Sequence, residues 1–387
     1  MIACSRTTLV FRGFIIATLL LCGCGGPLGG GAAAGTQDVT QIDGSIADTG
    51  VDSAAGPTDS VTADGLAADL APADIDTQPH LRDWQKYPAV VVRTQPKLLL
   101  AIGDIHGDLD RAQQVLKAAA AVDGDGHWIA VAGTTVVCTG DMIDKGDKSL
   151  MVVQWMRTLQ AQAVAAGGEV IVLLGNHEAE FLAAPDDVKV GEFAAELQVN
   201  GFPPAQVAQG LDAQGIGTWL RRLPVAARLG GWFFSHAGNT HGRTLAQLQA
   251  DLQNDLDLKG FASLQLLADD SILQTKLDVP WWQDDKQNSA DILKNWAQSL
   301  GAERFVQGHQ PGSVDLSDGP SGGTAKRKKY QLFQNYGRIF LIDCGMSQGV
   351  RSSDTAKDQA KPYGLMQLGN ATATAVFSDG SKSILWP

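Results

Sequence analysis

Five short polar motifs, each placed directly after an apolar run, constrain this sequence more than any other feature. The runs LLLAI, TTVVCT, EVIVLL, GWFF and RFVQ precede, in order, GDIHGD at 103–108, GDMIDKG at 140–146, GNHE at 175–178, SHAG at 235–238 and GH at 308–309. Short apolar runs of this composition are typical of buried strands. Loops at the carboxyl ends of strands converge in α/β folds, so we expect the five motifs to meet in one site.

The rest of the pattern alternates strands and helices at first and is mostly strand-like toward the end. Strands are predicted over 90–92, 98–102, 134–137, 169–174, 227–234, 304–306, 330–333, 338–342, 363–368 and 372–377. Helices are predicted over 109–122, 148–166, 244–276 and 289–300. This order predicts an α/β fold, a β-sandwich flanked by helices.

The side chains of the motifs are typical ligands of divalent metals. Four of the seven histidines lie in the motifs, at positions 106, 177, 236 and 309, together with several aspartates and an asparagine. Without a thiolate, these ligands suit Mn, Fe or Zn, and a carboxylate shared by two cations holds them about 3.5–4 Å apart. For His80, His127 and His241 we expect only solvent contacts or local hydrogen bonds.

Together the motifs resemble those of the calcineurin-like metallophosphoesterases, in the phosphoprotein phosphatase branch. The lead-in to TVVCTGD that contains Trp128, WLRRLP at 219–224 and IDCGMS at 342–347 are most similar to the bacterial Shewanella-like phosphatases. The resemblance covers about 97–347. It implies a β-sandwich fold, two divalent metal ions and a phosphorylated substrate.

The resemblance also implies a role for each motif residue. The implied metal ligands are Asp104, His106, Asp141, Asn176, His236 and His309, with Asp141 bridging the two cations. A water activated by the two cations would attack phosphorus, so no protein nucleophile is needed. His177 would be the general acid for the leaving group, oriented by Asp144. Asp144 can alternatively cap the helix expected to begin near Lys148.

Two positions depart from the family pattern. Lys145 stands where the family has an arginine that clamps the phosphate, and Gln283 stands where a further arginine is expected after two tryptophans. Lysine keeps the charge without the planar, bidentate contact of arginine, and glutamine carries no charge. Arg221 or Arg222 would substitute for the missing guanidinium, unless both are solvated helix charges. The metal and acid positions are complete, so we expect altered phosphate recognition in an active enzyme.

Three functions are therefore compatible with the sequence. The first is hydrolysis of phosphomonoesters, either phosphoproteins or small phosphate esters. The second is hydrolysis of a phosphoanhydride such as a dinucleoside polyphosphate. The third is a binding domain that keeps its metals without catalysis, which the complete acid and ligand set disfavours.

The first 80 residues predict export and a membrane anchor. Arg6 and Arg12 precede an apolar run at 14–21 that is too short to span a bilayer, and LCGC follows. LCGC resembles a bacterial lipobox with Cys24 as the lipidated residue, although an ordinary signal peptide with incidental cysteines is the alternative. Residue 25 is not aspartate, which favours the outer membrane, facing the periplasm or the cell surface. We expect a signal peptide at 1–24, a disordered tether at 25–80 and the catalytic domain at 81–387.

Charge and cysteine content add little to this picture. The net charge is −12, but nine aspartates lie in 25–80, which has no Lys, Arg or Glu. The mildly acidic remainder disfavours nucleic acid as a partner, and the lipid anchor is the only expected membrane contact. The basic run at 326–329 is expected in a solvated loop, or facing an anionic partner. Cys138 and Cys344 can pair or remain buried thiols.

Overall fold

The computed structural model describes residues 82–387, apart from 279, 285–286 and 317–324. The expected signal peptide, the tether and Cys24 lie outside the described residues. Among the described helices, none combines the length and the apolar character needed to cross a membrane.

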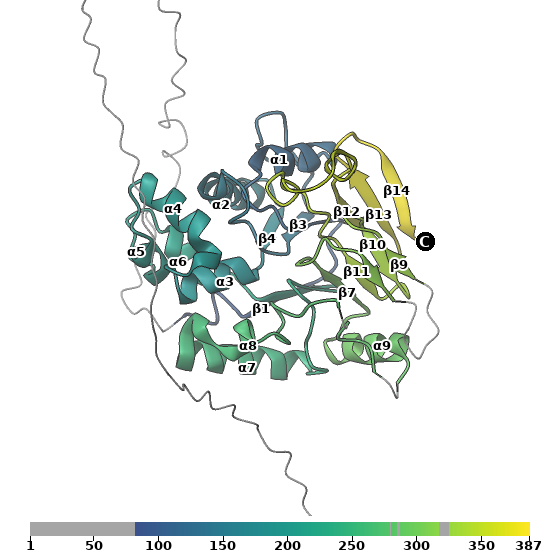
Figure 1. The fold of residues 1–387 in the computed structure, drawn as a ribbon. Helices are drawn as coiled ribbons and strands as arrows, with labels where there is room; N and C mark the ends of the chain where they lie inside the picture. Colours follow the sequence, from purple (N-terminus) through teal and green to yellow (C-terminus); the bar gives the residue numbers. More distant parts are fainter. Residues whose placement is uncertain (1–81, 279, 285–286, 317–324) are drawn as a thin grey trace, which may run out of the picture. The chain divides into compact units, whose positions relative to one another are not determined.

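Two six-stranded sheets form the centre of the domain (Figure 1). The first has the order β14-β13-β12-β2-β3-β4, and β2, β3 and β4 are parallel. Its strands are β2 (Leu98–Ile102), β3 (Thr134–Cys138), β4 (Glu169–Val172), β12 (Gly364–Leu368), β13 (Ala373–Phe377) and β14 (Lys382–Trp386). The last three strands of the chain extend the sheet antiparallel from the β2 edge.

The second sheet has the order β1-β5-β6-β7-β11-β10, with β6, β7 and β11 parallel. Its strands are β1 (Val90–Arg93), β5 (Ala226–Leu229), β6 (Trp232–Ser235), β7 (Arg304–Gln307), β10 (Phe333–Asn335) and β11 (Ile339–Leu341). A short ribbon pairs β8 (Val314–Asp315) with β9 (Lys326–Arg327). The motif loops follow the carboxyl ends of β2, β3 and β4 in the first sheet and of β6 and β7 in the second.

Aromatic side chains join the inner faces of the two sheets. The Trp232 indole N–H donates to the carbonyl of Gly369, just after β12, at 2.9 Å. The Phe340 ring lies 5.0 Å from Trp232 and 6.3 Å from Trp386 of β14. These contacts belong to one continuous apolar core, as a β-sandwich requires.

Helices cover the outer faces of the sandwich (Figure 1). They are α1 (Leu109–Ala118), α2 (Ser149–Ala165), α3 (Asn176–Ala183), α4 (Gly191–Val199), α5 (Pro204–Gln209), α6 (Ile216–Arg221), α7 (Leu245–Lys259), α8 (Leu264–Leu267), α9 (Ser289–Ser299) and α10 (Ala356–Gln359). Single-turn 3₁₀ helices occur at Val188–Val190 and Gly260–Ala262. Local sequence defines several helix starts: the side chains of Asp108, Thr244 and Asn288 cap α1, α7 and α9.

The predicted α/β sandwich is confirmed, with local differences. The strand predicted over 227–234 is a hairpin, β5 and β6, that turns at Gly230 with φ 56°. The predicted strand at 330–333 starts only at Phe333, because Tyr330 has a positive φ of 67°. Helices α3 to α6 and strand β14 were not predicted. These helices have six to nine residues, too few for an apolar period to stand out.

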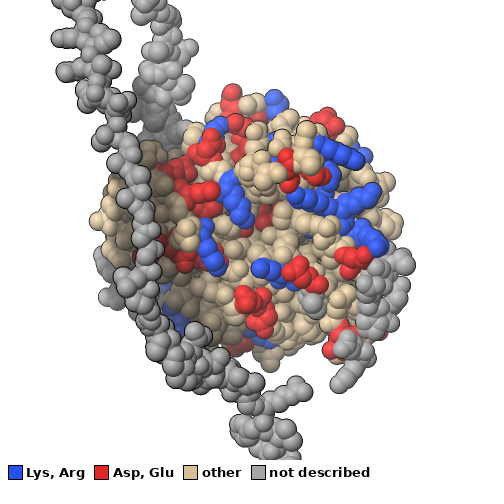
Figure 2. All heavy atoms as spheres, in the orientation of Figure 1, with Lys and Arg blue, Asp and Glu red and all other residues tan. Residues whose placement is uncertain are grey.

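The basic run at 326–329 divides between surface and interior. Lys326 pairs with Asp315 at 2.5 Å, and Lys329 pairs with Asp354. Arg327, in contrast, is 1% exposed. Figure 2 shows basic side chains gathering on the side of the C-terminal strands and acidic ones on the side of α2 and α4. The expectation of a wholly solvated run is therefore wrong at Arg327, because its guanidinium satisfies buried carbonyls.

Candidate metal centre

The motif loops turn sharply where their strands end. Positive φ angles of 46°, 52°, 59° and 72° occur at His106, Asp141, Asp144 and His309. Non-glycine residues seldom adopt this conformation, so their clustering indicates a backbone held by its surroundings. Gly140 has φ 100°, and a Cβ there would lie 2.4 Å from the Gly175 nitrogen. Only glycine therefore fits between the GDMIDKG and GNHE loops.

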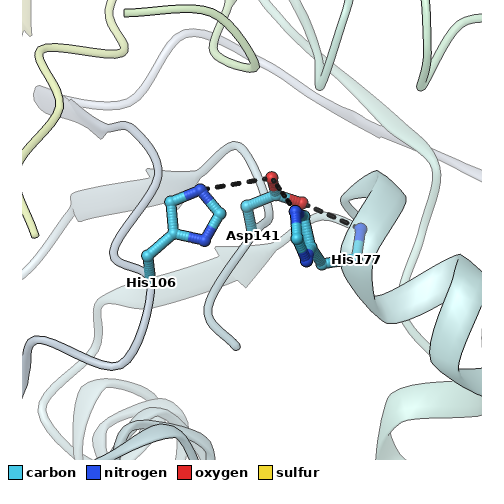
Figure 3. Close-up of side chains that lie close together, drawn as sticks. All are labelled: His106, Asp141 and His177. Carbon is cyan, nitrogen blue, oxygen red and sulfur yellow. Dashed lines mark hydrogen bonds and ion pairs between the residues drawn. The ribbon is translucent and has the colours of Figure 1, made fainter. Parts of the chain in front are cut away.

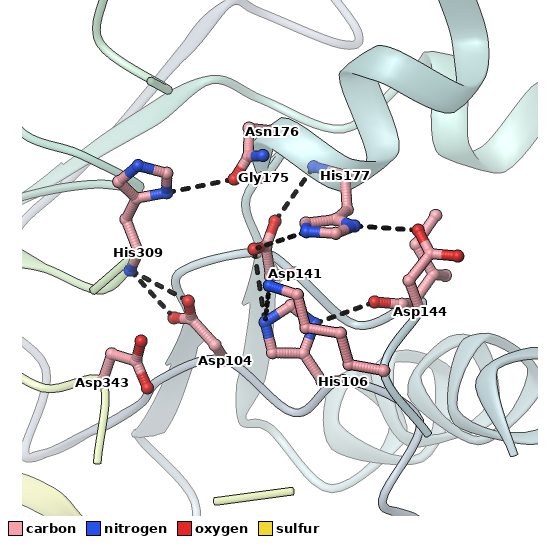
Figure 4. Close-up of polar contacts among 12 residues, drawn as sticks. Asp104, His106, Asp141, Asp144, Gly175, Asn176, His177, His309 and Asp343 are labelled. Atoms are coloured by element: carbon pink, nitrogen blue, oxygen red, sulfur yellow. Dashed lines mark hydrogen bonds and ion pairs between the residues drawn. The ribbon is translucent and has the colours of Figure 1, made fainter. Parts of the chain in front are cut away.

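Asp141 lies at the centre of the converging loops (Figures 3 and 4). Its Oδ2 is 3.5 Å from His106 Nε2, and its Oδ1 is 3.4 Å from His236 Nε2. Burial raises the pKa of Asp141, but His236 and His177 outweigh this effect and hold it well below its ordinary value. One ionised carboxylate thus faces a different imidazole with each oxygen, as a ligand shared by two cations does.

His106 directs a nitrogen lone pair toward Asp141. Its Nδ1 lies 3.0 Å from the carbonyl of Ile143, which can only accept, so the proton is on Nδ1. Nε2 is then the unprotonated nitrogen. Burial lowers the pKa of His106 to about 3, so the ring is neutral at physiological pH. A neutral imidazole with its far nitrogen fixed by a carbonyl is a prepared metal ligand.

Three further donors meet on the other side of Asp141. His236 Nε2 lies 2.9 Å from Asn176 Oδ1 and 3.1 Å from His309 Nδ1, and Asn176 Oδ1 is 3.1 Å from His309 Nδ1. The outer nitrogens of the two rings contact carbonyls, of Thr139 for His236 at 2.9 Å and of Gln274 for His309 at 3.2 Å. Each carbonyl places a proton on the outer nitrogen, and the inner nitrogen of each ring faces the amide oxygen. Burial lowers the pKa of His309 to about 3; in His236 the effect of burial is outweighed by Asp141, and the pKa is raised.

Asp104 is the remaining predicted metal ligand, and Asp343 influences its charge. The His309 N–H donates to Asp104 Oδ2 at 2.9 Å, and a Cβ on Gly308 would lie 2.1 Å from Asp104 Oδ1. Burial, followed by the charges of Asp343 and Asp141, raises the pKa of Asp104 well above its ordinary value. Asp343 follows β11 and is 2% exposed. Sequence reasoning quoted IDCGMS but did not assign Asp343 to the site.

The donor chemistry fits divalent cations. Three buried aspartates lie together with imidazole lone pairs and an amide oxygen, and such like charges require a compensating cation. Two groups are close enough to hold a metal ion, His106 with Asp141 and His177, and Asp141 with His236 and His309. A third group of this kind, 123–127, has an exposed aspartate and histidine and lies in a separate loop.

His177 and Asp144 form a hydrogen-bonded pair at the edge of the centre. His177 Nδ1 lies 2.8 Å from Asp144 Oδ2, and its Nε2 lies 4.0 Å from Asp141 Oδ2. Burial lowers the pKa of His177, but Asp141 and the hydrogen bond to Asp144 outweigh it, and the pKa is raised. Asp144 does not cap α2; its Oδ1 accepts the Phe193 N–H at 2.9 Å, and Lys148 occupies the cap position.

Glu178 is a functional candidate that sequence reasoning did not assign, although it is the last letter of GNHE. It is fully buried, and its carboxylate accepts the N–H groups of Asp141 at 2.9 Å, Met142 at 2.7 Å and Gly175 at 2.9 Å. Burial raises the pKa of Glu178 to about 7. Its contacts tie the GDMIDKG and GNHE loops together, so Glu178 positions Asp141.

Lys145 points into the centre. Its Nζ lies 3.4 Å from His106 Nε2. Its backbone is fixed on both sides: its N–H donates to Glu192 at 2.5 Å, and its carbonyl accepts from Ser347 Oγ at 3.0 Å. The same carbonyl lies against Gly349. A Cβ at residue 349 would lie 1.5 Å from the Lys145 oxygen, so only glycine fits there.

The other proposed phosphate contacts are not brought to the centre. Arg221 donates to the carbonyl of Ala208 at 3.0 Å and lies over the Phe261 ring. Arg222 lies over the Tyr87 ring, at 4.6 Å from its centroid. None of these contacts involves a metal-binding side chain, and they do not bring either guanidinium group to the centre.

Gln283 lies in a loop next to the centre. Its N–H closes a turn with the carbonyl of Pro280 at 2.8 Å, and its side chain is half-buried. Trp281, in the same turn, donates to Gln307 Oε1 at 3.1 Å, just before Gly308. A role for Gln283 with the substrate stays a prediction.

Cys138 and Cys344 are both buried and unpaired. Burial raises the pKa of both thiols, that of Cys344 to about 11. Of the two alternatives, the structure has the buried thiols.

Comparisons with known proteins agree on the family. A sequence model described as calcineurin-like phosphoesterase matches residues 98–313. Shewanella-like protein phosphatase 2 of Arabidopsis thaliana is 37% identical over 84 residues, 22% of this chain and 21% of the relative. An uncharacterised Schizosaccharomyces pombe protein is 29% identical over 282 residues, covering 67% of this chain and 74% of its own. The chain thus spans about a fifth of the plant relative.

The chain is also similar in sequence to a second kind of hydrolase and in fold to solved phosphatase structures. The symmetrical bis(5'-nucleosyl)-tetraphosphatase of Nitrosococcus oceani is 32% identical over 133 residues, 34% of this chain and 39% of the relative. The solved structure of a cold-active protein-tyrosine phosphatase from a psychrophilic Shewanella species aligns with a TM-score of 0.54. It has 22% identity and covers 77% of this chain and 82% of that one. This likeness supports the sandwich fold.

Proposed function

Because the chain belongs to the calcineurin-like phosphoesterase family, we propose that it hydrolyses phosphomonoesters, either phosphoproteins or small phosphate esters, at a centre of two divalent cations. The observation that carries this proposal is the position of Asp141 between two separate donor sets, with one carboxylate oxygen facing each. Mn, Fe and Zn all suit these imidazole, carboxylate and amide donors.

Each donor set would hold one cation. Asp104, His106 and Asp141 would hold the first; Asp141, Asn176, His236 and His309 would hold the second. Bound there, divalent cations supply an activated water and neutralise charge on phosphoryl oxygens. The chain supplies rigidity, because the far nitrogen of each ligating ring is fixed by a carbonyl.

His177 would protonate the leaving oxygen. Asp144 holds the ring through Nδ1, so Nε2 is the nitrogen turned toward Asp141. The raised pKa of His177 keeps more of the ring protonated near neutral pH, which a general acid requires. Lys145 would contact the phosphate as a point charge, without the bidentate contact of arginine.

A substrate panel tests this proposal. The protein, loaded with Mn²⁺, is assayed on p-nitrophenyl phosphate, phosphoserine and phosphotyrosine peptides and a dinucleoside tetraphosphate. We expect the highest kcat/KM on a phosphomonoester, and we expect Asp141→Asn and His309→Ala to remove nearly all activity. Metal binding without turnover on any substrate would contradict the proposal and support a non-catalytic metal-binding domain.

A dinucleoside polyphosphate is the second candidate substrate. The observation that favours it is the similarity to symmetrical bis(5'-nucleosyl)-tetraphosphatases, at 28–32% identity over part of the chain. A kcat/KM on diadenosine tetraphosphate well above that on every monoester would select this function. Cleavage of the same compound at equal or lower efficiency would leave the monoesterase proposal in place.

We propose further that Cys24 carries a lipid anchor that holds the enzyme at the outer membrane, facing the periplasm or the cell surface. The sequence LCGC supports this proposal. Metabolic labelling with an alkyne fatty acid in a bacterial host tests it: the intact chain should be labelled and sediment with membranes, and Cys24→Ser should do neither. Equal labelling of both would contradict it.

A further inference from the structure

The IDCGMS segment at 342–347 lies against two of the loops that supply metal ligands. Near its start, a Cβ on Gly103 would lie 3.2 Å from the Asp343 Cα. At its end, the Ser347 hydroxyl donates to the carbonyl of Lys145 at 3.0 Å. The segment is therefore held against both the loop after β2 and the loop after β3, although none of the predicted metal ligands belongs to it.

Asp343 places a buried carboxylate next to Asp104. Figure 4 shows the two side chains beside each other at the edge of the centre, and neither is more than 2% exposed. After burial, the charge of Asp343 is the main cause of the raised pKa of Asp104. Two ionised carboxylates in such a place repel each other, and a cation beside them relieves the repulsion.

The Asp343 carboxylate is only partly used by the protein itself. Its Oδ1 accepts the Gly345 N–H at 2.8 Å, whereas its Oδ2 has no hydrogen bond to any residue that the structure describes. The buried guanidinium of Arg327 donates instead to backbone carbonyls, including that of Asp343. One oxygen of a buried carboxylate is thus left for a further partner.

Glu178, another buried carboxylate of the centre, differs in this respect. Its Oε1 accepts the N–H of Met142, and its Oε2 accepts the N–H groups of Asp141 and Gly175. Both oxygens of Glu178 are therefore occupied by the backbone that they support. Asp343, in contrast, keeps an oxygen for a cation.

The two proposed cation sites differ in charge once Asp343 is counted. Asp104 and Asp141 belong to the first donor set, and Asp343 adds a third carboxylate beside them. The second set shares Asp141, and its other members are amide and imidazole donors, Asn176, His236 and His309. More negative charge around a cation strengthens its binding, so the first site should be the tighter of the two.

We propose that Asp343 is a further acidic residue of the first cation site, and that its charge makes this site bind a divalent cation more tightly than the second site does. The inference rests on the proposed centre of two cations. It gives the IDCGMS segment a part in metal binding, in addition to its contact with Lys145.

Calorimetric titration of the metal-free full chain with Mn²⁺ tests the inference. We expect two binding steps in the original chain. Asp343→Asn keeps the oxygen that accepts the Gly345 N–H and removes only the charge, so it should weaken the tighter step about tenfold and change the other less than twofold. The matched control, Asp291→Asn, removes an exposed carboxylate from α9 and should leave both steps unchanged.

Two ligand substitutions assign the binding steps to the sites. Asp104→Asn should weaken the same step as Asp343→Asn, and Asn176→Ala should weaken the other. Unchanged or higher affinity of Asp343→Asn, or a loss confined to the step that Asn176→Ala weakens, would overturn the inference and leave the centre of two cations in place. An original chain that binds fewer than two Mn²⁺ would contradict that centre, and the inference with it.

Thermal unfolding separates this role from a structural one. In a chelator, Asp343→Asn lacks the repulsion with Asp104, so its melting temperature should equal or exceed that of the original chain. At the same Mn²⁺ concentration the variant should gain less than the original chain, because it binds the cation more weakly. A lower melting temperature in the chelator, with an unchanged shift on adding Mn²⁺, would show that Asp343 only supports the fold.

Discussion

At the scale of single residues, the centre depends on which nitrogen of each ring carries the proton. His106, His236 and His309 each place one nitrogen against a backbone carbonyl and turn the other toward Asp141 or Asn176. His177 differs, because its outer nitrogen contacts the carboxylate of Asp144 at 2.8 Å. A carbonyl fixes which nitrogen of a ring carries the proton, so the other nitrogen of each ligand ring faces the centre. Burial lowers the pKa of His177, but Asp141 and the hydrogen bond to Asp144 outweigh it and raise this pKa, as a general acid requires.

The substitution His177→Asn tests whether His177 is the general acid. We expect kcat on an alkyl phosphate to fall about 10²-fold or more, and kcat on an aryl phosphate to fall much less, because phenolate needs little proton assistance. Steady-state kinetics on phosphoserine peptide and p-nitrophenyl phosphate measure the difference. Equal losses on the two substrates would refute the general-acid role.

The pH dependence of activity tests the hydrogen-bonded pair of His177 and Asp144. Activity on an alkyl phosphate should decline as pH rises through the raised pKa of His177, since the deprotonated ring cannot donate. Asp144→Asn removes a hydrogen bond that raises this pKa, so the declining limb should move to lower pH. A limb that stays in place, or moves upward, would contradict the assignment.

Lys145→Arg tests phosphate recognition. Lys145 Nζ is 3.4 Å from His106 Nε2, so a guanidinium at this position would reach the same space with two donors. We expect KM for phosphomonoesters to fall about fivefold, which corresponds to roughly 1 kcal/mol. Lys148→Arg is the matched control, because Lys148 pairs with Asp110 at 2.6 Å on the surface. An unchanged or higher KM would count against a phosphate contact.

At the scale of elements, side chains from one loop fix the backbone of another. Glu178 at the start of α3 accepts the N–H groups of the loop after β3. Arg327 in β9 donates to the carbonyls of Gln310 and Asp343, just after His309 and just after β11. Both side chains are almost fully buried. The ligand loops are thus held by charged groups that touch no metal position.

Arg327→Met tests this support. Removing the guanidinium leaves buried carbonyls without donors, so we expect roughly 3 kcal/mol or more of lost stability. We also expect weaker Mn²⁺ binding by calorimetry, with Arg327→Lys intermediate. Loss of a nearby positive charge alone would tighten cation binding, so tighter or unchanged binding would show that Arg327 does not position the ligands. Lys328→Met is the exposed control.

At the scale of the whole molecule, stability and metal binding are coupled. Asp104 and Asp343 are buried close to Asp141, and their mutual repulsion contributes to the raised pKa of Asp104. These residues come from both sheets, so a cation that neutralises them joins the two halves of the sandwich.

Mn²⁺ should therefore raise the melting temperature. At 100 times Kd the added stability is about 2.7 kcal/mol, or roughly 5 °C or more for a domain of this size. Differential scanning fluorimetry with Mn²⁺ and after chelation measures the shift. Asp141→Asn should reduce it strongly, while Asp123→Asn/Asp125→Asn, in the separate acidic loop, should keep it. A full shift in Asp141→Asn would place the stabilising ion elsewhere.

The sequence by itself determined the sandwich, the motif residues and their family. Those features are local, because apolar runs, glycine turns and histidine positions can all be read along the chain. It did not assign Asp343 or Glu178, whose roles arise from contacts between distant loops. It also left Arg221 and Arg222 between a phosphate contact and solvated helix charges, and it predicted a solvated loop, or one facing an anionic partner, for the run that contains Arg327. Only the tertiary structure decided these positions, because burial and the partner of a charged group depend on which segments pack together.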